Sequence, residues 1–353
     1  MTPTQQKAVV YFTLFACAAL LTLFTFDTWE TVLLVSLLLV ITSYGIILTT
    51  DRLTPLDSTS LEGFTSQRAT TGGAADSTRQ EWLETDELFD AFYASIFTKL
   101  TQNENLIQAE TAICLKEFTK DRPASDLVVA DIGCGIGIAT CSLIKQGVKQ
   151  AIGVDKSRAM LQYAKDTTLT GTTLSDSQKQ AVEFRMADAL GPGAMMGGEC
   201  DAALILYFTV YYFGKQMDTL FRNLHLWVKP GGSLAIEVVN KYKFEPVLDS
   251  SNPWVGVSPQ RYQKERMTRS QAVFDQFEYQ GDFELQDPNA EFREVFRFKD
   301  GTVRRQRHRL TMPSIKEIIQ MASENGWLYT KYVDLMPLTF SYGYLLFFTR
   351  KAD

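Results

Sequence analysis

The stretch Leu127–Thr140, LVVADIGCGIGIAT, decides the fold of this 353-residue chain. Its apolar start, Leu127–Ala130, predicts a buried parallel strand that ends at Asp131. Glycines alternate with other residues directly afterwards, and Ile138–Gln146 then has the composition of a helix. Glycine lets the backbone turn tightly and lets a ligand lie against the main chain, and a helix N-terminus offers unpaired N–H groups to a polar ligand. The stretch therefore predicts a strand, a glycine turn and a helix beside a bound small molecule.

The spacing of the glycines narrows the choice of ligand. Gly133, Gly135 and Gly137 read G-x-G-x-G, whereas a dinucleotide fingerprint needs G-x-G-x-x-G, with its third glycine where Ile138 stands. Asp131 precedes them, where its carboxylate can accept hydrogen bonds from an ammonium group or from the loop. This pattern resembles motif I of the class I S-adenosylmethionine (SAM)-dependent methyltransferases. The resemblance implies SAM as cofactor, and the spacing argues against a dinucleotide-dependent oxidoreductase.

The chain beyond this stretch alternates strands and helices. Helical segments at Met160–Lys165 and Tyr211–Trp227, with a polar loop at Thr167–Ser177, separate four more predicted strands: Ala151–Val154, Ala181–Met186, Cys200–Phe208 and Ser233–Asn240. Such alternation predicts a parallel sheet with right-handed crossovers. The resemblance implies the Rossmann-like seven-stranded methyltransferase sheet, an α/β fold with helices on both faces.

The region after the fifth strand breaks the alternation. Phe283–Arg309 reads as antiparallel strands around Asp300-Gly301, which is a strong hairpin signal. The segments that follow predict a helix and two closing strands, at Ser314–Asn325, Trp327–Leu335 and Tyr342–Arg350. This order matches the family's sheet, with an antiparallel insertion at 241–310 and a reversed hairpin at the edge. The insertion resembles the substrate-capping additions of small-molecule methyltransferases.

Two helices are predicted ahead of the glycine stretch. Apolar residues recur at helical spacing in Trp82–Leu100, and a second helix is expected at Asn105–Thr119. In many class I methyltransferases such leading helices cover the cofactor, and an aromatic residue faces it. Phe92 or Tyr93 is the candidate here, with core packing as the favoured alternative for each.

Acidic residues continue the family's pattern at the ends of the predicted strands. Asp155 closes the second strand, where the family's carboxylate holds both ribose hydroxyls, and Asp188 follows the third, where it meets the adenine amino group. Ligands of open α/β sheets bind at this edge; a strand-end cap at Asp155 and a plain loop position at Asp188 are the alternatives. Trp227–Gly232, WVKPGG, resembles the turn before the family's fifth strand. The resemblance implies a cofactor-binding set of Asp131, Gly133, Cys134, Gly135, Gly137, Asp155, Lys156, Asp188, Ala189 and Tyr207.

The catalytic residue is harder to predict. Methyl transfer from a sulfonium rests mainly on alignment of acceptor and methyl group, so a protein base is needed only where the acceptor loses a proton. Leu206–Thr209 stands where DNA and amide methyltransferases carry N/D-P-P-Y, which argues against a nucleic-acid base as acceptor. Aromatic packing and, for the histidine, a solvated strand position are the alternatives to an acceptor-orienting or deprotonating role. The candidates for that role are Tyr207, Tyr211, Tyr212 and His308.

Charge and composition argue against other classes of protein. The net charge of −6 does not suit a dedicated nucleic-acid binder. The five cysteines form no CxxC pair and there are only two histidines, which argues against a metal site or a disulfide framework. The basic tract Arg304–Arg309 suits anionic headgroups, but cross-strand pairing of Glu294 with Arg307 is favoured.

Two apolar stretches precede all of these motifs. Ala8–Phe26 and Val32–Leu48 are each long enough for a transmembrane helix, which needs roughly 20 residues; a signal peptide and a buried core helix are the alternatives. The loop between them has no Lys or Arg, whereas Lys7 and Arg52 flank the pair, which predicts a cytosolic catalytic domain. We therefore expect a membrane hairpin at 1–50, a flexible linker at 51–80 and the methyltransferase domain at 81–353.

The sequence as a whole predicts a membrane-anchored SAM-dependent methyltransferase that acts on a small-molecule or lipid acceptor. A protein acceptor is the nearest alternative. From another class, the chain could be a non-catalytic scaffold that keeps the SAM-binding fold for partner binding. The intact glycine motif and both acidic residues argue against loss of the cofactor.

Overall fold

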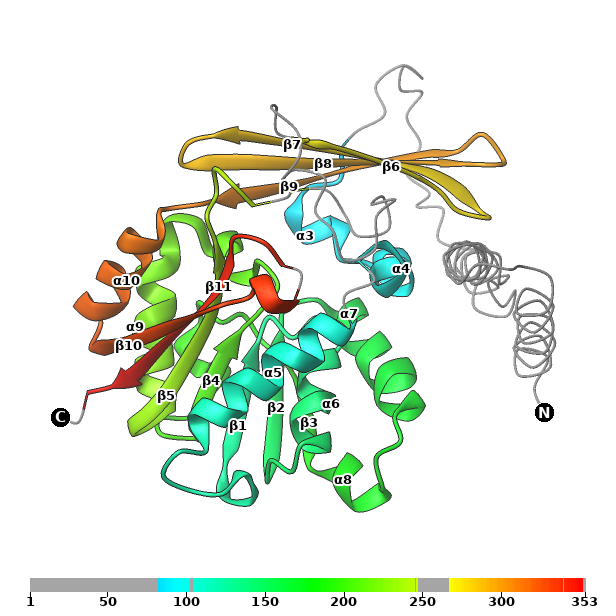
Figure 1. The fold of residues 1–353 in the computed structure, drawn as a ribbon. Coiled ribbons are helices and arrows are strands. Elements are labelled where there is room, and N and C mark those ends of the chain that lie inside the picture. The colour runs from blue at the N-terminus through cyan, green and yellow to red at the C-terminus, as the bar shows by residue number, and fades with distance from the viewer. Residues whose placement is uncertain (1–81, 102–103, 245, 247–266, 339, 352–353) are drawn as a thin grey trace, which may run out of the picture. The chain divides into compact units, whose positions relative to one another are not determined.

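The computed structural model describes residues 82–101, 104–244, 246, 267–338 and 340–351 (Figure 1). The chain divides into two compact units, residues 1–75 and 76–353, and every described residue lies in the second. The predicted spans Ala8–Phe26 and Val32–Leu48 and the linker 51–80 lie outside the described residues. Within the described part, no helix has the length and apolar character needed to cross a bilayer.

A seven-stranded sheet forms the centre of the domain, in the order β10-β11-β5-β4-β1-β2-β3. Strands β1 to β5 pair in parallel, and β11 runs antiparallel to both β5 and β10. This confirms the predicted sheet with its reversed edge hairpin. The strands are β1 (Val128–Ile132), β2 (Gln150–Asp155), β3 (Val182–Met186), β4 (Cys200–Ile205), β5 (Val228–Val239), β10 (Trp327–Asp334) and β11 (Gly343–Arg350).

Helices cover both faces of this sheet, as predicted (Figure 1). One buried cluster joins the sheet to α5, α6 and α7, and a second joins its other face to α9 and α10. The central strand β4 is buried along its whole length, and its residues are apolar apart from Asp201. The helices are α3 (Thr85–Leu88), α4 (Ala91–Thr101), α5 (Glu104–Phe118), α6 (Ile138–Lys145), α7 (Arg158–Tyr163), α8 (Asp176–Gln180), α9 (Met217–Trp227) and α10 (Ile315–Glu324), with 3-10 turns η3 (Ala124–Asp126), η5 (Pro192–Ala194), η6 (Thr209–Gln216) and η9 (Met336–Leu338).

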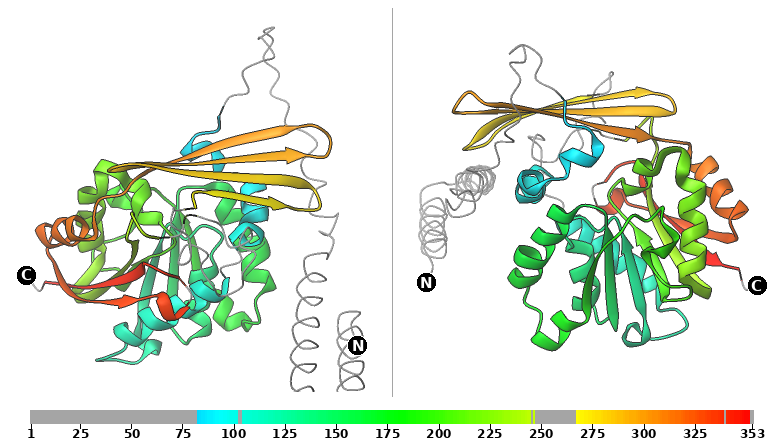
Figure 2. Two further views of the ribbon diagram at one scale, coloured as in Figure 1. Left: turned by 45° about the horizontal axis from the view of Figure 1, so that its top comes forward. Right: turned by 180° about the vertical axis from the view of Figure 1, so that it is seen from behind.

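The insertion after β5 is a separate antiparallel sheet in the order β6-β7-β8-β9. It lies across the end of the larger sheet in both Figure 1 and the rear view of Figure 2. The predicted Asp300-Gly301 turn joins β8 to β9: Gly301 has φ +86° and Asp300 accepts the N–H of Thr302. We refer to this sheet as the cap sheet. Its strands are β6 (Arg269–Val273), β7 (Phe277–Gln286), β8 (Asn289–Phe298) and β9 (Val303–Thr311).

The structure differs from the predicted boundaries of three secondary-structure elements. The strand expected to reach Phe208 ends at Ile205, because Tyr207 and Phe208 have φ of 51° and 60°. The helix expected at Tyr211–Trp227 is the 3-10 segment η6 followed by α9, and Gly214 breaks the helical geometry inside η6. The loop expected at Thr167–Ser177 begins inside a π-helical turn at Ala164–Leu169 and ends in α8.

Candidate active site

The glycine loop between β1 and α6 has the left-handed backbone that its sequence suggests. Gly133, Gly135 and Gly137 have φ of +71°, +52° and +78°, a region that other residues rarely adopt. A Cβ atom on Gly133 would lie 2.3 Å from Thr209 Cγ2, and one on Gly137 would lie 2.6 Å from the Phe184 ring. The first and third glycines are therefore required by the packing of the chain itself.

Asp155 fastens this loop to the turn after β2. Its Oδ2 accepts the N–H of Gly135 at 2.9 Å, and its Oδ1 accepts the N–H of Ser157 at 2.8 Å. Burial raises the pKa of this carboxyl, and the hydrogen bonds from Ser157 and Gly135 oppose that rise. Each carboxylate oxygen has a second lone pair available, so the contact with ribose hydroxyls stays a prediction that this geometry permits.

Asp131 is buried near the end of β1. Its carboxyl is 2 % exposed, and Oδ2 accepts a hydrogen bond from Thr140 Oγ1 of α6 at 2.6 Å. Burial raises its pKa to about 7, and the charge of Asp155 adds to the rise. Asp131 therefore joins β1 to α6, and its contact with a cofactor stays a prediction.

The other predicted cofactor residues lie at the same edge of the sheet. Burial raises the pKa of Cys134, which keeps this loop residue a thiol. Lys156 and Asp188 are exposed after β2 and β3, and Asp188 Oδ1 accepts the N–H of Leu190 at 2.9 Å. Ala189 is buried, and its carbonyl accepts the amide of Asn223. Asp188 thus holds its own turn, as the loop alternative expected, and its contact with adenine stays a prediction.

A strained turn follows β4 at the same edge. Tyr207 and Phe208 both have positive φ, which is uncommon outside glycine and is often found at functional sites. Glu237 of β5 is buried and accepts the N–H of Tyr207 at 2.5 Å, and burial raises its pKa to about 7. The Tyr207 ring lies edge-on to Phe97 of α4, with centroids 5.3 Å apart. Sequence reasoning missed Glu237, although a lone carboxylate in an apolar strand was a visible signal.

Tyr211 has a structural contact that accounts for its position. Its side chain is buried, and its hydroxyl accepts the N–H of Val239 at 2.8 Å. Burial raises the pKa of this phenol. Tyr211 therefore fixes η6 against β5, and its neighbour Tyr212 is the tyrosine that contacts His308.

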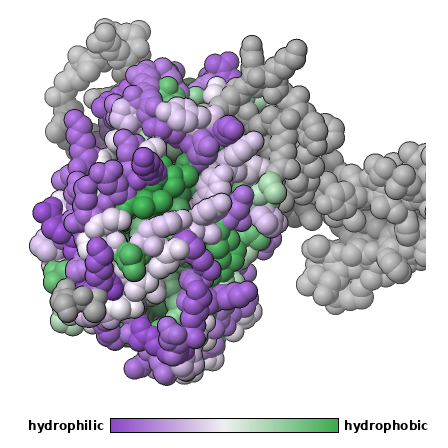
Figure 3. Space-filling model, turned by 60° about the vertical axis from the view of Figure 1, so that its left-hand side comes forward, coloured by the Kyte–Doolittle hydropathy of each residue, from purple (hydrophilic) through white to green (hydrophobic). Residues whose placement is uncertain are grey.

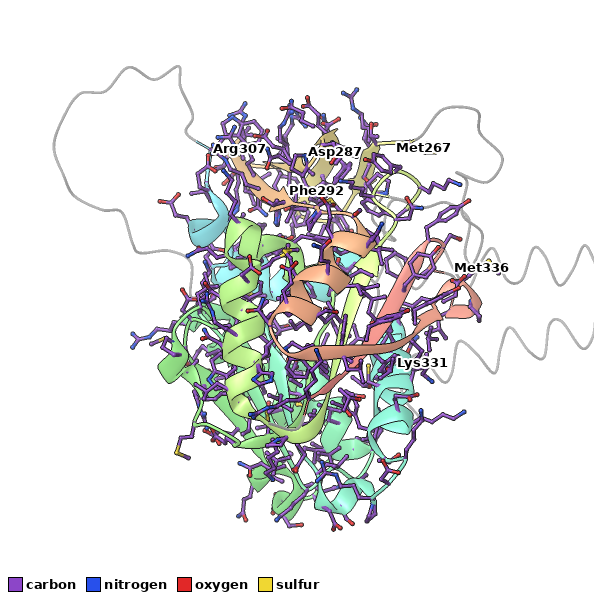
Figure 4. The ribbon with its side chains drawn as sticks, turned by 90° about the vertical axis from the view of Figure 1, so that its left-hand side faces the viewer. Met267, Asp287, Phe292, Arg307, Lys331 and Met336 are labelled. Atoms are coloured by element: carbon purple, nitrogen blue, oxygen red, sulfur yellow. The ribbon has the colours of Figure 1, made fainter. Side chains whose placement is uncertain are left out.

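The expectation that His308 is solvated on its strand is wrong. Its side chain is 3 % exposed, with Nδ1 2.6 Å from the hydroxyl of Tyr212 and Nε2 2.6 Å from Glu294 Oε2. The expected pairing of Glu294 with Arg307 is also wrong. The register pairs Glu294 with Gln306, so Glu294 shares the inner face with His308, while Arg307 pairs with Glu84 and lies at the margin of the cap sheet (Figure 4).

Aromatic side chains surround the histidine. The rings of Phe89, Tyr93 and Phe292 lie 5.9, 5.8 and 5.6 Å from the ring of His308, and Phe292 points from the cap sheet toward the larger sheet (Figure 4). Phe92 instead packs on the cap sheet, 5.3 Å from Phe296, which is the core packing expected for it. The face of the molecule drawn in Figure 3 is mostly hydrophilic, with hydrophobic residues gathered near its middle.

The segment before the first long helix joins both sides of this site. The carbonyl of Phe89 accepts a hydrogen bond from Ser157 Oγ at 2.6 Å, next to Asp155. Asp90 pairs with Arg304 of β9 at 2.7 Å. The leading segment is therefore tied to the predicted cofactor side and to the cap sheet.

Comparison with known proteins agrees with this geometry. Residues 129–232 match a protein family described as "Methyltransferase domain". Residues 129–232 of the chain thus form a methyltransferase domain. The match spans β1 to the start of β5, and so includes the glycine loop, Asp155 and the strained turn.

Solved structures share the fold of this methyltransferase domain. The CcbJ methyltransferase from Streptomyces caelestis is 14 % identical, with a TM-score of 0.55 over 76 % of this chain and 100 % of that one. A SAM-dependent methyltransferase from Clostridium acetobutylicum is 15 % identical, with a TM-score of 0.53 over 74 % of this chain and 98 % of that one. A sugar N-methyltransferase from a Streptoalloteichus species is 17 % identical, with a TM-score of 0.51 over 80 % of this chain and 100 % of that one. At these identities the likeness concerns the fold.

Curated proteins match over a shorter part. A ribosomal protein L11 methyltransferase from Cellvibrio japonicus is 24 % identical over 149 residues, which is 42 % of this chain and 46 % of that protein. A carboxy-S-adenosyl-L-methionine synthase from Shewanella sediminis is 25 % identical over 164 residues, which is 45 % of this chain and 63 % of that protein. The chain thus spans less than two thirds of the length of either relative.

Proposed function

We propose that this chain transfers the methyl group of SAM to a small-molecule acceptor held between the methyltransferase sheet and the cap sheet. The observation that carries the proposal is the position of β9, which brings His308 within 2.6 Å of the hydroxyl of Tyr212 in η6, the segment that follows β4. An acceptor there would meet aromatic rings and few charges, which suits a compact molecule better than a polymer chain. The fold likeness to a sugar N-methyltransferase over the whole of that chain supports the same class.

The test uses SAM with a labelled methyl group and an extract of the source cells, separated into small molecules, lipids and proteins. We expect the full chain to place label in the small-molecule fraction. The control is a chain carrying Gly135→Ala, which we expect to fold without binding SAM. Label confined to the protein fraction would contradict the proposal and favour a protein acceptor, and SAM binding without transfer to any fraction would favour a scaffold.

We further propose a membrane anchor at Ala8–Phe26 and Val32–Leu48, with the catalytic domain on the cytosolic side. The sequence alone supports this, because neither stretch has a polar face that would suit packing on a soluble domain. In lipid each could satisfy its own backbone hydrogen bonds as a helix. An anchored enzyme would also meet a lipid acceptor at high local concentration, which makes a lipid the second candidate substrate.

Deletion of Met1–Thr50 should make the protein soluble without loss of SAM affinity. The reason is that the residues of the candidate site all come from the second compact unit, residues 76–353. The measurement is membrane fractionation with calorimetry of SAM binding, on the full and shortened chains. A full chain that stays in the supernatant without detergent would contradict the anchor, and a folded shortened chain that cannot bind SAM would contradict its independence.

A further inference from the structure

Glu294 is a fully buried carboxyl group surrounded by hydrogen-bond donors. It is 0 % exposed. Oε1 accepts the hydroxyl of Tyr279 at 3.0 Å, and Oε2 accepts the amide of Gln306 at 2.6 Å. His308 Nε2 lies 2.6 Å from the same Oε2. Because a carboxylate only accepts hydrogen bonds, the proton of a neutral His308 ring belongs on Nε2.

This assignment fixes the role of the other ring nitrogen. With its proton on Nε2, His308 has an acceptor at Nδ1. The Tyr212 hydroxyl, 2.6 Å away, then donates its proton to Nδ1. The phenol oxygen keeps lone pairs that can accept a hydrogen bond from a further group. Tyr212 is half-buried whereas His308 and Glu294 are buried, and the series of hydrogen bonds ends at the tyrosine hydroxyl.

The backbone of η6 brings that oxygen toward the predicted cofactor site. Thr209, the first residue of η6, lies against the glycine loop, where a Cβ on Gly133 would come within 2.3 Å of it. Residues three apart in a 3-10 helix lie above one another. Tyr212 is three residues after Thr209, so both project from the same side of η6. One therefore touches the loop predicted to hold SAM while the other contacts His308.

We propose that Tyr212, His308 and Glu294 form a proton relay that takes up the proton of the acceptor. This proposal rests on the proposed function. The acceptor's N–H or O–H donates to the oxygen of Tyr212. As its nitrogen or oxygen bonds to the methyl carbon, the bond from that carbon to the sulfonium breaks and leaves a neutral thioether. The acceptor's proton passes to Tyr212 while the tyrosine's own proton passes to His308 Nδ1. Glu294 then stabilises the imidazolium, and acts as a positioning residue.

The relay gives the acceptor a defined chemical class. The molecule must carry an exchangeable proton on the atom that is methylated, as a primary or secondary amine or a hydroxyl does. A tertiary amine or a thioether has no proton to give and would gain nothing from Tyr212. Burial raises the pKa of Tyr212, so the phenol passes a proton between two partners and is not itself the final base.

The position of the ring proton can be measured directly, because the chain has only two histidines. The full chain is labelled with ¹⁵N-histidine, and His225→Gln removes the second signal. We expect a neutral ring protonated on Nε2, a loss of that preference in Glu294→Gln, and a shift of the Nδ1 resonance alone in Tyr212→Phe. A ring protonated on Nδ1 would overturn the relay, because His308 would then donate to Tyr212.

The kinetic test uses the full chain, labelled SAM and the small-molecule fraction of the source cells as the acceptor probe. We expect Tyr212→Phe and His308→Gln to lower the transfer rate by about 100-fold or more while SAM affinity stays unchanged. His225→Gln is the matched control, which should transfer at the wild-type rate. If His308→Gln fails to fold, Tyr212→Phe decides the question, because it removes a single oxygen.

The outcomes separate the relay from the function on which it rests. Wild-type transfer that Tyr212→Phe leaves unchanged overturns the relay and leaves the proposed function in place. A wild-type chain that binds SAM and transfers nothing overturns the proposed function, and the relay with it.

Discussion

Alanine in place of Gly135 is expected to remove SAM binding while the domain stays folded. A Cβ at Gly135 would lie 3.4 Å from Met160 Cε, an ordinary contact, so the chain itself has room for a methyl group. The left-handed backbone costs a non-glycine residue roughly 1–2 kcal/mol. The added methyl would stand on the loop where the cofactor is expected to lie, so we expect SAM affinity to fall by about 100-fold or more, or about 2.8 kcal/mol.

Gly147 provides the matched control for this substitution. Its φ is +92°, and a Cβ built there has no heavy atom of the described residues within 4 Å. It lies between α6 and β2, at the opposite end of the sheet from the glycine loop. Gly147→Ala should therefore lower stability in denaturant by about the same amount as Gly135→Ala and leave SAM calorimetry unchanged. If Gly135→Ala binds SAM like the wild type, the loop is only a structural turn.

Asp155→Ala is expected to weaken SAM binding at least tenfold. The substitution removes the acceptor for the N–H groups of Gly135 and Ser157, and with it the predicted contacts to the ribose hydroxyls. Hydrogen bonds to a charged group contribute roughly 1.5–3 kcal/mol each, so losing even one accounts for a tenfold change. Calorimetry should show the same loss for SAM and for its demethylated product, because both contain the ribose.

Asp188→Ala is the companion variant for this measurement. Asp188 is exposed and caps its own turn through Leu190, so its loss should leave the glycine loop intact. Any fall in affinity would then come from the predicted adenine contact. If Asp155→Ala binds SAM with unchanged affinity, Asp155 is not part of the cofactor site, and this conclusion holds for any result with Asp188→Ala.

The central sheet was predictable because its signals are local. Strands β1 and β2 contain short apolar runs that end at a glycine-rich or an acidic turn, and α10 begins at Ser314, whose hydroxyl and Glu317 form a capping box. The first six residues of β7, Phe277–Asp282, escaped prediction, although this strand buries alternate residues at Phe277, Tyr279, Gly281 and Phe283. Gly281 interrupts the apolar half of this period of two.

The candidate site was only partly predictable because it depends on register. Pairing Glu294 with Arg307 is one residue from the observed pairing with Gln306, and such a slip moves every side chain to the opposite face. That slip hid the contact of Glu294 with His308. Tyr212 and His308 lie 96 residues apart in sequence, and no local pattern brings them together. The glycine loop and Asp155, by contrast, adjoin in consecutive turns and were found.

The single bridge formed by Leu83 has a consequence for where the domain can be cut. Leu83 donates its N–H to the carbonyl of Arg305 and accepts the N–H of Arg307, and so pairs with part of β9, the edge strand of the cap sheet. Unpaired edge strands recruit other chains and promote aggregation. A fragment that begins at residue 129, where the family match starts, would lack Leu83 and leave this edge of β9 unpaired. A fragment designed to keep this edge paired must therefore include Leu83.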